Sequence, residues 1–147
     1  MTKREQIIAH VAAVLSSPTL SGVPVYRSRI SALNPFNADG ALVQPLSILV
    51  APETDKRGEI QNLQTERMLF LNIAVLSVGD VADSLADPVV EEIFRRLSTD
   101  TSLGGLCKKI REEETHFDFV QMGMDNCLVT LKFAIAYTHN TLDLSKE

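Results

Sequence analysis

The chain has 147 residues, of which 45% are hydrophobic and 22% charged, which suits one folded domain with its own core and argues against disorder. Its formal net charge is −5 and its fourteen Lys and Arg residues are scattered, so we do not expect nucleic-acid binding as its main role. The sequence contains neither an apolar run of the roughly 18 to 20 residues that cross a membrane nor a secretion signal, so we expect a cytoplasmic protein without membrane contact.

The first expected element is a helix at the beginning of the chain. Thr2 and Glu5 form a T-x-x-E capping box, in which each side chain satisfies an unpaired backbone N–H near the helix start. The apolar residues that follow at helical spacing form one stripe: Ile7, Ile8, Val11, Val14 and Leu15. Pro18 ends the helix, because proline cannot continue the hydrogen-bond ladder.

Two short strands and a long loop are expected next. Residues 22–30 and 45–53 read as the strands, and residues 31–44 between them form a polar loop with turn signals. A loop of this length is uncommon in a compact domain unless it binds something or becomes ordered elsewhere.

The segment that follows predicts a polar crossover and then a central strand. Residues 54–64 are polar, and Lys56-Arg57-Gly58 predicts a turn within them. Residues 65–78 are apolar on both faces, which is typical of a central strand or of a strand whose second face is covered by another subunit.

A second helix is expected after Gly79. Asp87 can cap it and Pro88 fits its first helical position. The charges that follow complement the helix dipole, with acids near its start and bases near its end: Glu91, Glu92, Arg95 and Arg96.

The last third predicts a long β-hairpin. Gly104-Gly105 gives a bend after the helix, residues 106–119 a first strand, and residues 120–125 the turn. Residues 126–139 alternate between two faces, as in a long half-buried strand. Residues 141–147 are expected to be a frayed tail.

The register of this hairpin follows from its apolar residues. Placing Ile110 on the same side as Ile135 puts Glu113 opposite Lys132, a favourable cross-strand charge pair. Glu112, Glu114 and His116 then share one face of the strand. Because both faces carry charges, we expect this end of the hairpin to leave the core as a solvated or partner-facing arm.

The same register separates the two cysteines. Cys127 pairs near Asp118, on the order of 35 Å along the strand from Cys107, so an intrachain disulfide is out of reach. We expect two reduced thiols used as small core residues.

The acidic stretch KIREEETHFD, residues 109–118, contains residue types that can bind a metal ion. If it were helical, Glu113 and His116 would form a Glu-x-x-His step, but di-iron sites of that kind need a second such step, and the chain has none. HExxH, GxSxG, GxGxxG and Walker-type motifs are also absent from the sequence. We therefore predict no catalytic residue, no metal ligand and no cofactor.

The candidate contact residues come from three segments. They are Phe36 and Asn37 in the long loop, Arg57 and Leu63 in the crossover, and Glu112, Glu114, Met122 and Met124 on the hairpin. For each of them, the alternative of an ordinary solvated loop residue stays open.

The order of elements resembles that of the tail terminator proteins (minor tail or tail completion proteins) of long-tailed bacteriophages. The resemblance extends over about residues 3–140 and depends on that order and on the phrases ILVAPE, RMLFLNIAVL and PVVEEIFRRL. It implies one α+β domain, residues 1–147, with two main helices packed on one face of a mostly antiparallel sheet of about five strands. The long C-terminal β-hairpin is part of that sheet.

The resemblance also implies a structural role without catalysis or cofactor. Members of this family form six-membered rings that cap the growing tail tube, halt its polymerisation and present a surface for joining the head. The implied partners are further copies of the chain, the tail tube protein and a head–tail connector protein, in the virion tail after assembly in the host cytoplasm. We expect DNA only to pass through the ring, because an acidic chain offers few phosphate contacts.

Two alternatives stay open. One is another phage neck or connector component, or a tail-derived bacterial assembly protein. The other, from a different class, is a small ligand-binding α+β domain or an enzyme whose site the sequence does not reveal.

Overall fold

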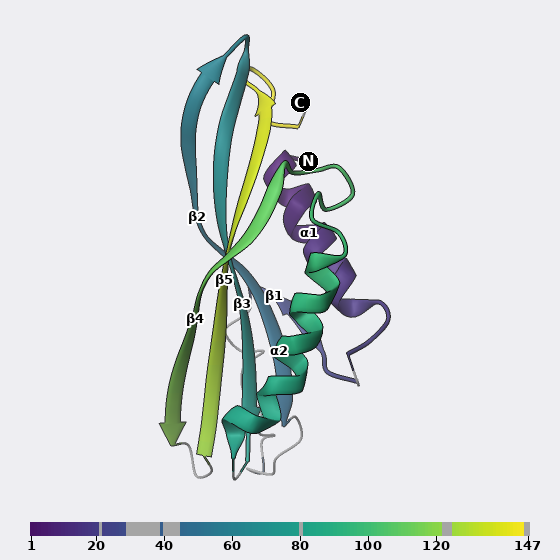
Figure 1. The fold of residues 1–147 in the computed structure, drawn as a ribbon, viewed down its shortest axis with the longest axis vertical. Helices are drawn as coiled ribbons and strands as arrows, with labels where there is room; N and C mark the ends of the chain where they lie inside the picture. The colour runs from purple at the N-terminus through teal and green to yellow at the C-terminus, as the bar shows by residue number, and fades with distance from the viewer. Residues whose placement is uncertain (21, 29–38, 40–44, 80, 122–124, 146–147) are drawn as a thin grey trace.

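The computed structural model describes residues 1–20, 22–28, 39, 45–79, 81–121 and 125–145. These contain two helices, α1 (Lys3–Ser16) and α2 (Ala82–Ser98), and five strands. The strands are β1 (Val25–Arg27), β2 (Leu46–Gln61), β3 (Gln64–Val78), β4 (Lys109–Gln121) and β5 (Asp125–Asn140). They form one sheet in the order β1-β2-β3-β5-β4, in which β1 is parallel to β2 and the other neighbours are antiparallel. Both helices lie on one side of the sheet (Figure 1), so the predicted α+β architecture is confirmed.

The core lies between the helices and one face of the sheet. The central strand β3 contributes Leu69, Leu71, Ile73 and Val75, all fully buried. The predicted alternation of β5 is confirmed, because its core face is buried throughout: Cys127, Val129, Leu131, Phe133, Ile135 and Tyr137. The core face of α1 supplies Ile7, Ile8, Val11 and Leu15. The buried residues of β5 therefore identify the face of the sheet that packs against the helices.

Helix α1 begins and ends as predicted. The Thr2 hydroxyl accepts a hydrogen bond from the Glu5 N–H at 3.1 Å, and the last helical residue is Ser16, two positions before Pro18. The Glu5 carboxylate accepts two hydrogen bonds from the Arg27 guanidinium, at 2.7 and 3.1 Å. These hydrogen bonds lower the pKa of Glu5 and fasten β1 to the first turn of α1.

The predicted start of α2 at Asp87 and Pro88 is wrong. The helix begins at Ala82, and Pro88 lies inside it, where its missing N–H leaves one gap in the ladder. Ala82 and Ala86 precede Val89 at helical spacing, and all three are buried against the core. Packing of this buried face against the core keeps the residues before Pro88 helical, although local propensity alone would place Pro88 at the start of the helix.

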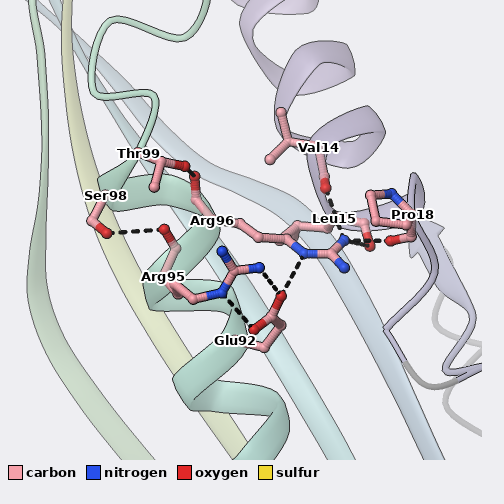
Figure 2. A network of polar contacts seen from close by, with 8 residues as sticks. All are labelled: Val14, Leu15, Pro18, Glu92, Arg95, Arg96, Ser98 and Thr99. Atoms are coloured by element: carbon pink, nitrogen blue, oxygen red, sulfur yellow. Dashed lines mark hydrogen bonds and ion pairs between the residues drawn. The ribbon is translucent and has the colours of Figure 1, made fainter.

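The Arg96 side chain joins the two helices (Figure 2). It is 8% exposed, and its Nη1 donates to the carbonyl oxygens of Val14, Leu15 and Pro18 at 3.1, 3.2 and 2.5 Å. The last carbonyls of a helix have no partner within that helix, so the guanidinium caps the end of α1. The Arg96 Nε donates a hydrogen bond to the Glu92 carboxylate at 3.1 Å. Glu92 also pairs with Arg95.

Replacing Arg96 with methionine should lower the free energy of unfolding by about 2–4 kcal/mol, because three carbonyl groups lose a buried charged donor. Urea denaturation followed by circular dichroism measures the change. Arg95→Met is the matched control, since the Arg95 side chain is 62% exposed and its solvent-screened ion pair should contribute much less to stability. Equal effects of the two substitutions would contradict a special role for Arg96.

The free energy of unfolding should also decrease as the pH is lowered, because the Glu92 carboxylate becomes protonated. Hydrogen bonds from Arg95 and then Arg96 lower the pKa of Glu92 from 4.5 to about 2. A carboxyl whose pKa is lower in the folded state stabilises the fold above pH 4.5, and that contribution is lost as the pH falls toward 2. Urea denaturation of the wild type between pH 6 and 2 should show this loss. Glu92→Gln should have a weaker pH dependence in the same range, and an unchanged profile would exclude Glu92 as its source.

The predicted crossover with a turn at Lys56-Arg57-Gly58 is wrong. Strand β2 continues through these residues to Gln61, and the turn is formed by Asn62 and Leu63, both with positive φ (52° and 62°). Two consecutive residues of this kind make the tight turn that matches the twist of a β-hairpin. One extra residue of β2 lies between Arg57, paired with Arg67, and Ile60. The β2–β3 hairpin extends beyond the start of β4 at the top of Figure 1.

Within the described residues, the segment predicted to be a frayed tail (141–147) makes specific hydrogen bonds at residues 141–145, and residues 146 and 147 lie outside that part of the chain. Thr141 donates from its backbone N–H to the Leu63 carbonyl at 2.7 Å, and its hydroxyl lies 3.0 Å from that of Thr65. The Leu144 carbonyl accepts from the Lys3 N–H at 2.7 Å. The tail therefore connects the hairpin turn with the start of α1.

Of the remaining predicted segments, the long loop 31–44 apart from Asp39, and residues 122–124 of the turn at 120–125, lie outside the described residues. The predicted strand at 22–30 is found as the shorter β1. The bend at Gly104-Gly105 is confirmed, since both residues have positive φ, at 68° and 86°.

Candidate functional site

Strand β4 forms one edge of the sheet, and it carries the acidic stretch. Every residue from Arg111 to Phe119 is exposed. Strand β5 lies between β3 and β4 and is paired with both, so the expected two-stranded arm that leaves the core is wrong. The charges on both faces of this segment reflect its edge position, because an edge strand has water on one side along its length.

A β-bulge divides β4 into two parts. Ile110 pairs with Ile135 as predicted, but one extra residue lies between Glu112 and Glu114, so that Glu114 rather than Glu113 is opposite Lys132. The predicted common face of Glu112, Glu114 and His116 is therefore wrong. Glu112 pairs with the buried Phe133 on the helix side, and the other two lie on the opposite side. Bulges re-aim the side chains that follow them.

The bulge turns two aromatic residues toward the helix side of the edge. Phe117 pairs with Val129, and Phe119 pairs with Cys127. The predicted partner of Cys127 was Asp118, so the prediction is wrong by one residue. The two phenyl side chains are 52% and 68% exposed. These two phenylalanines are absent from the candidates predicted from the sequence, because the neighbouring charged residues indicate a solvated strand. The alternation of aromatic and charged residues over 116–119 was the signal that could have identified them.

A small apolar cleft lies between α2 and the beginning of β4. It has a volume of about 230 Å³, and its apolar lining residues are Phe94, Leu97, Ile110 and Phe133, with Arg111 and Glu112 among the polar ones. The Phe94 and Phe133 rings contact each other with centroids 5.7 Å apart. Ligand pockets usually measure about 300–1,000 Å³, so the cleft suits one or two side chains of a partner better than a substrate.

The candidate contact residues divide between two edges of the sheet. Arg57 and Leu63 are exposed on the β2–β3 hairpin, and Glu112 and Glu114 are exposed on β4. Because β3 and β5 separate β2 from β4, the structure does not bring the two pairs together within one subunit. The other four candidates, Phe36, Asn37, Met122 and Met124, lie outside the described residues.

The histidines each have a different local partner. His10 is 2.8 Å from Asp100, and the exposed His116 is 3.2 Å from Asp118 on the same strand. His139 is buried and accepts from Arg67 Nε at 3.1 Å. In the part of the chain that the structure describes, no three His, Cys, Asp or Glu residues are grouped so as to hold a metal ion.

A partly buried polar cluster lies under the β2–β3 hairpin on the helix side of the sheet. Tyr137 donates to Asp55 at 2.6 Å, Arg4 lies 3.3 Å from the same carboxylate, and Arg67 and His139 line the adjoining cavity of about 40 Å³. Burial and the hydrogen bond to Asp55 raise the pKa of Tyr137. A cavity of this size holds a water molecule but not a substrate, so the cluster fastens the hairpin to α1. Its members are far apart in the sequence, so no local pattern indicates that they lie together.

Both cysteines are unpaired, buried thiols, as predicted. Burial, followed by the charge of Asp100, raises the pKa of Cys107 to about 11, and burial also raises the pKa of Cys127. The thiolate is the reactive form, so neither residue is suited to nucleophilic chemistry at neutral pH.

A thiol reagent such as dithionitrobenzoate should therefore react with neither cysteine in the folded protein at pH 8 and with both after denaturation in guanidinium. The release of thionitrobenzoate measures the reaction. A thiol that reacts rapidly without denaturant would contradict the burial of that residue.

Neither helix within the described ranges is long and apolar enough to cross a membrane. Comparisons of the chain with models of known protein families and with curated proteins give no match. The candidate site is therefore defined by the two exposed sheet edges and by the side chains on them.

Proposed function

We propose that the chain is a structural tail terminator protein of a long-tailed bacteriophage. In this proposal it forms a hexameric ring that caps the tail tube, stops its polymerisation and provides the surface to which the head joins. The resemblance of residues 3–140 to that family supports the proposal, and so does the agreement between the implied architecture and the observed one, with both helices on one face of a mostly antiparallel sheet.

The observation that carries the proposal is the pair of open sheet edges on one subunit. Strand β4 is exposed from Arg111 to Phe119, and in the described residues β2 beyond Val50 has a partner only on its β3 side. Open edges bind further strands, and proteins usually block long ones. Two different edges on the same subunit allow the head-to-tail contact that closes into a ring.

The proposed partners follow from this role. They are further copies of the chain, the tail tube protein and the head–tail connector protein, in the virion tail after assembly in the host cytoplasm. No cofactor or catalytic step is part of the proposal. In this proposal DNA passes through the ring without a specific binding site. The formal net charge of −5 favours weak contact with DNA, because phosphate contacts come mainly from Lys and Arg.

A second candidate of the same class is a different neck or connector component. The open edges support ring formation equally well in that role. The two candidates differ in what the ring binds, because only a terminator stops the growth of the tube.

Light scattering coupled to size-exclusion chromatography should find a species of six times the 16.2 kDa subunit mass, either for the protein alone or after addition of tube ends. Electron microscopy should show rings. When the protein is added to polymerising tail tube protein, the tubes should become shorter as the molar ratio rises. Rings that leave the tube length unchanged would favour the connector role. A chain that stays monomeric even with tubes present would overturn the proposal.

A further inference from the structure

The two open edges are complementary in strand direction. From β2 to β4 the order is β2-β3-β5-β4, and each neighbouring pair in this series is antiparallel. Strands β2 and β4 therefore run in opposite directions, as their courses in Figure 1 also indicate. A second copy related by rotation about an axis along the strands presents its β2 antiparallel to the β4 of the first.

We propose that residues 56–61 of one copy add as an antiparallel strand to residues 109–114 of the next, with Ile60 opposite Ile110. This inference rests on the proposed self-assembly and names its contact. The added strand satisfies backbone groups along both edges, and the side chains fix the register, as in other cases of strand addition.

The charges along the two edges are complementary in this register. Lys56 is opposite Glu114, Arg57 is opposite Glu113, and Glu59 is opposite Arg111. All six side chains belong to exposed residues. Opposite charges across a strand pair stabilise it, and like charges destabilise it.

Shifting the register by one residue in either direction reduces the number of opposite-charge pairs from three to two or one. A shift one way places Glu59 opposite Glu112, and a shift the other way places Asp55 opposite Glu114. Each shift therefore brings two carboxylates together and leaves Ile60 opposite a charged side chain. The sequence of the two edges thus selects one register.

The faces of the strands also agree. Ile60 pairs with Thr65, on the same side of β3 as the buried Leu69, so it lies on the helix side with Ile110. Lys56 pairs with Met68 and lies on the opposite side, as does Glu114. Strand β2 has one extra residue between Lys56 and Ile60, and β4 has one between Ile110 and Glu114. The side chains therefore lie on matching faces of the sheet at both ends of the contact. The 52% exposed Ile60 would then extend the apolar lining of the cleft that contains Ile110.

The stagger of this register suits a closed ring of sheets. A line across the strands from Lys109 passes Ala136, Met68 and Lys56, and it reaches Glu114 of the next copy. Because Lys109 pairs with Ala136 and Glu114 pairs with Lys132, the stagger is about four residues of β5 over four strands, or about 13 Å along the strands against about 19 Å across them. The corresponding tilt is about 35°, at the lower end of the range of roughly 35–45° in which sheets close into barrels.

Exchanging one charge pair tests the register. Lys56→Glu and Glu114→Lys should each raise the concentration needed for ring formation by about tenfold, a cost of about 1.4 kcal/mol, and the double variant should restore it. Light scattering measures the assembly, and thermal unfolding confirms that each variant folds. Glu91→Lys, a charge reversal on the exposed side of α2, is the control and should assemble like the wild type.

Engineered cysteines test the position of the contact directly. In the double variant Ile60→Cys and Ile110→Cys, mild oxidation should link copies into a ladder of covalent oligomers, because opposite residues have Cβ atoms about 5 Å apart. Within one chain the two positions are three strand spacings apart, about 14 Å, too far for a disulfide. Ile60→Cys with Thr115→Cys, on the same face but out of register, should give no ladder.

The outcomes separate the contact from the proposed function. Rings that form in the wild type without rescue by the double charge reversal and without the ladder would overturn the edge contact and leave the proposed function standing. A wild type that remains monomeric, alone and with tubes, would overturn both. Rescue together with the ladder would support the register, whatever the ring binds.

Discussion

The arrangement of the subunit depends on the buried Arg96 guanidinium, which holds the end of α1 against α2. It replaces the backbone partners that the last turn of α1 lacks, and it does so from within the core rather than from the surface. With α1 held there, Arg27 reaches Glu5 and β1 lies beside the first part of β2 only. Among the described residues, the outer part of β2 is paired on its β3 side only.

Much of the fold could be predicted because its signals are local and mutually consistent. The Thr2 cap, the alternation of β5 and the apolar residues of β3 each depend on a short stretch of sequence with a single best conformation. The register at Ile110 and Ile135 followed from the same alternation. These elements supply the core, where burial of apolar side chains and local propensity favour the same structure.

The predictions from the sequence are wrong where a contact between residues distant in the sequence decides the local structure. Pro88 is a good first residue for a helix, yet packing of Ala82 and Ala86 places it in the interior. A polar stretch that includes Gly58 looks like a turn, but pairing with β3 keeps it extended. The bulge at Glu113 has no sequence signature, and it decides the side on which Phe117 and Phe119 lie. The exposure of Arg57, Leu63, Glu112 and Glu114 was foreseeable, whereas their place on open edges follows from strand order.

The connection between the chain end and the β2–β3 turn has an entropic consequence. Thr141 holds the Leu63 carbonyl, the Thr65 and Thr141 hydroxyl groups are in contact, and Leu144 is in turn held by Lys3. An unsupported hairpin would sample many orientations and lose that freedom on docking, which weakens association. Here the loss has already occurred during folding of the isolated subunit, so the hairpin is preorganised. More of the interaction energy at this edge is then available as affinity.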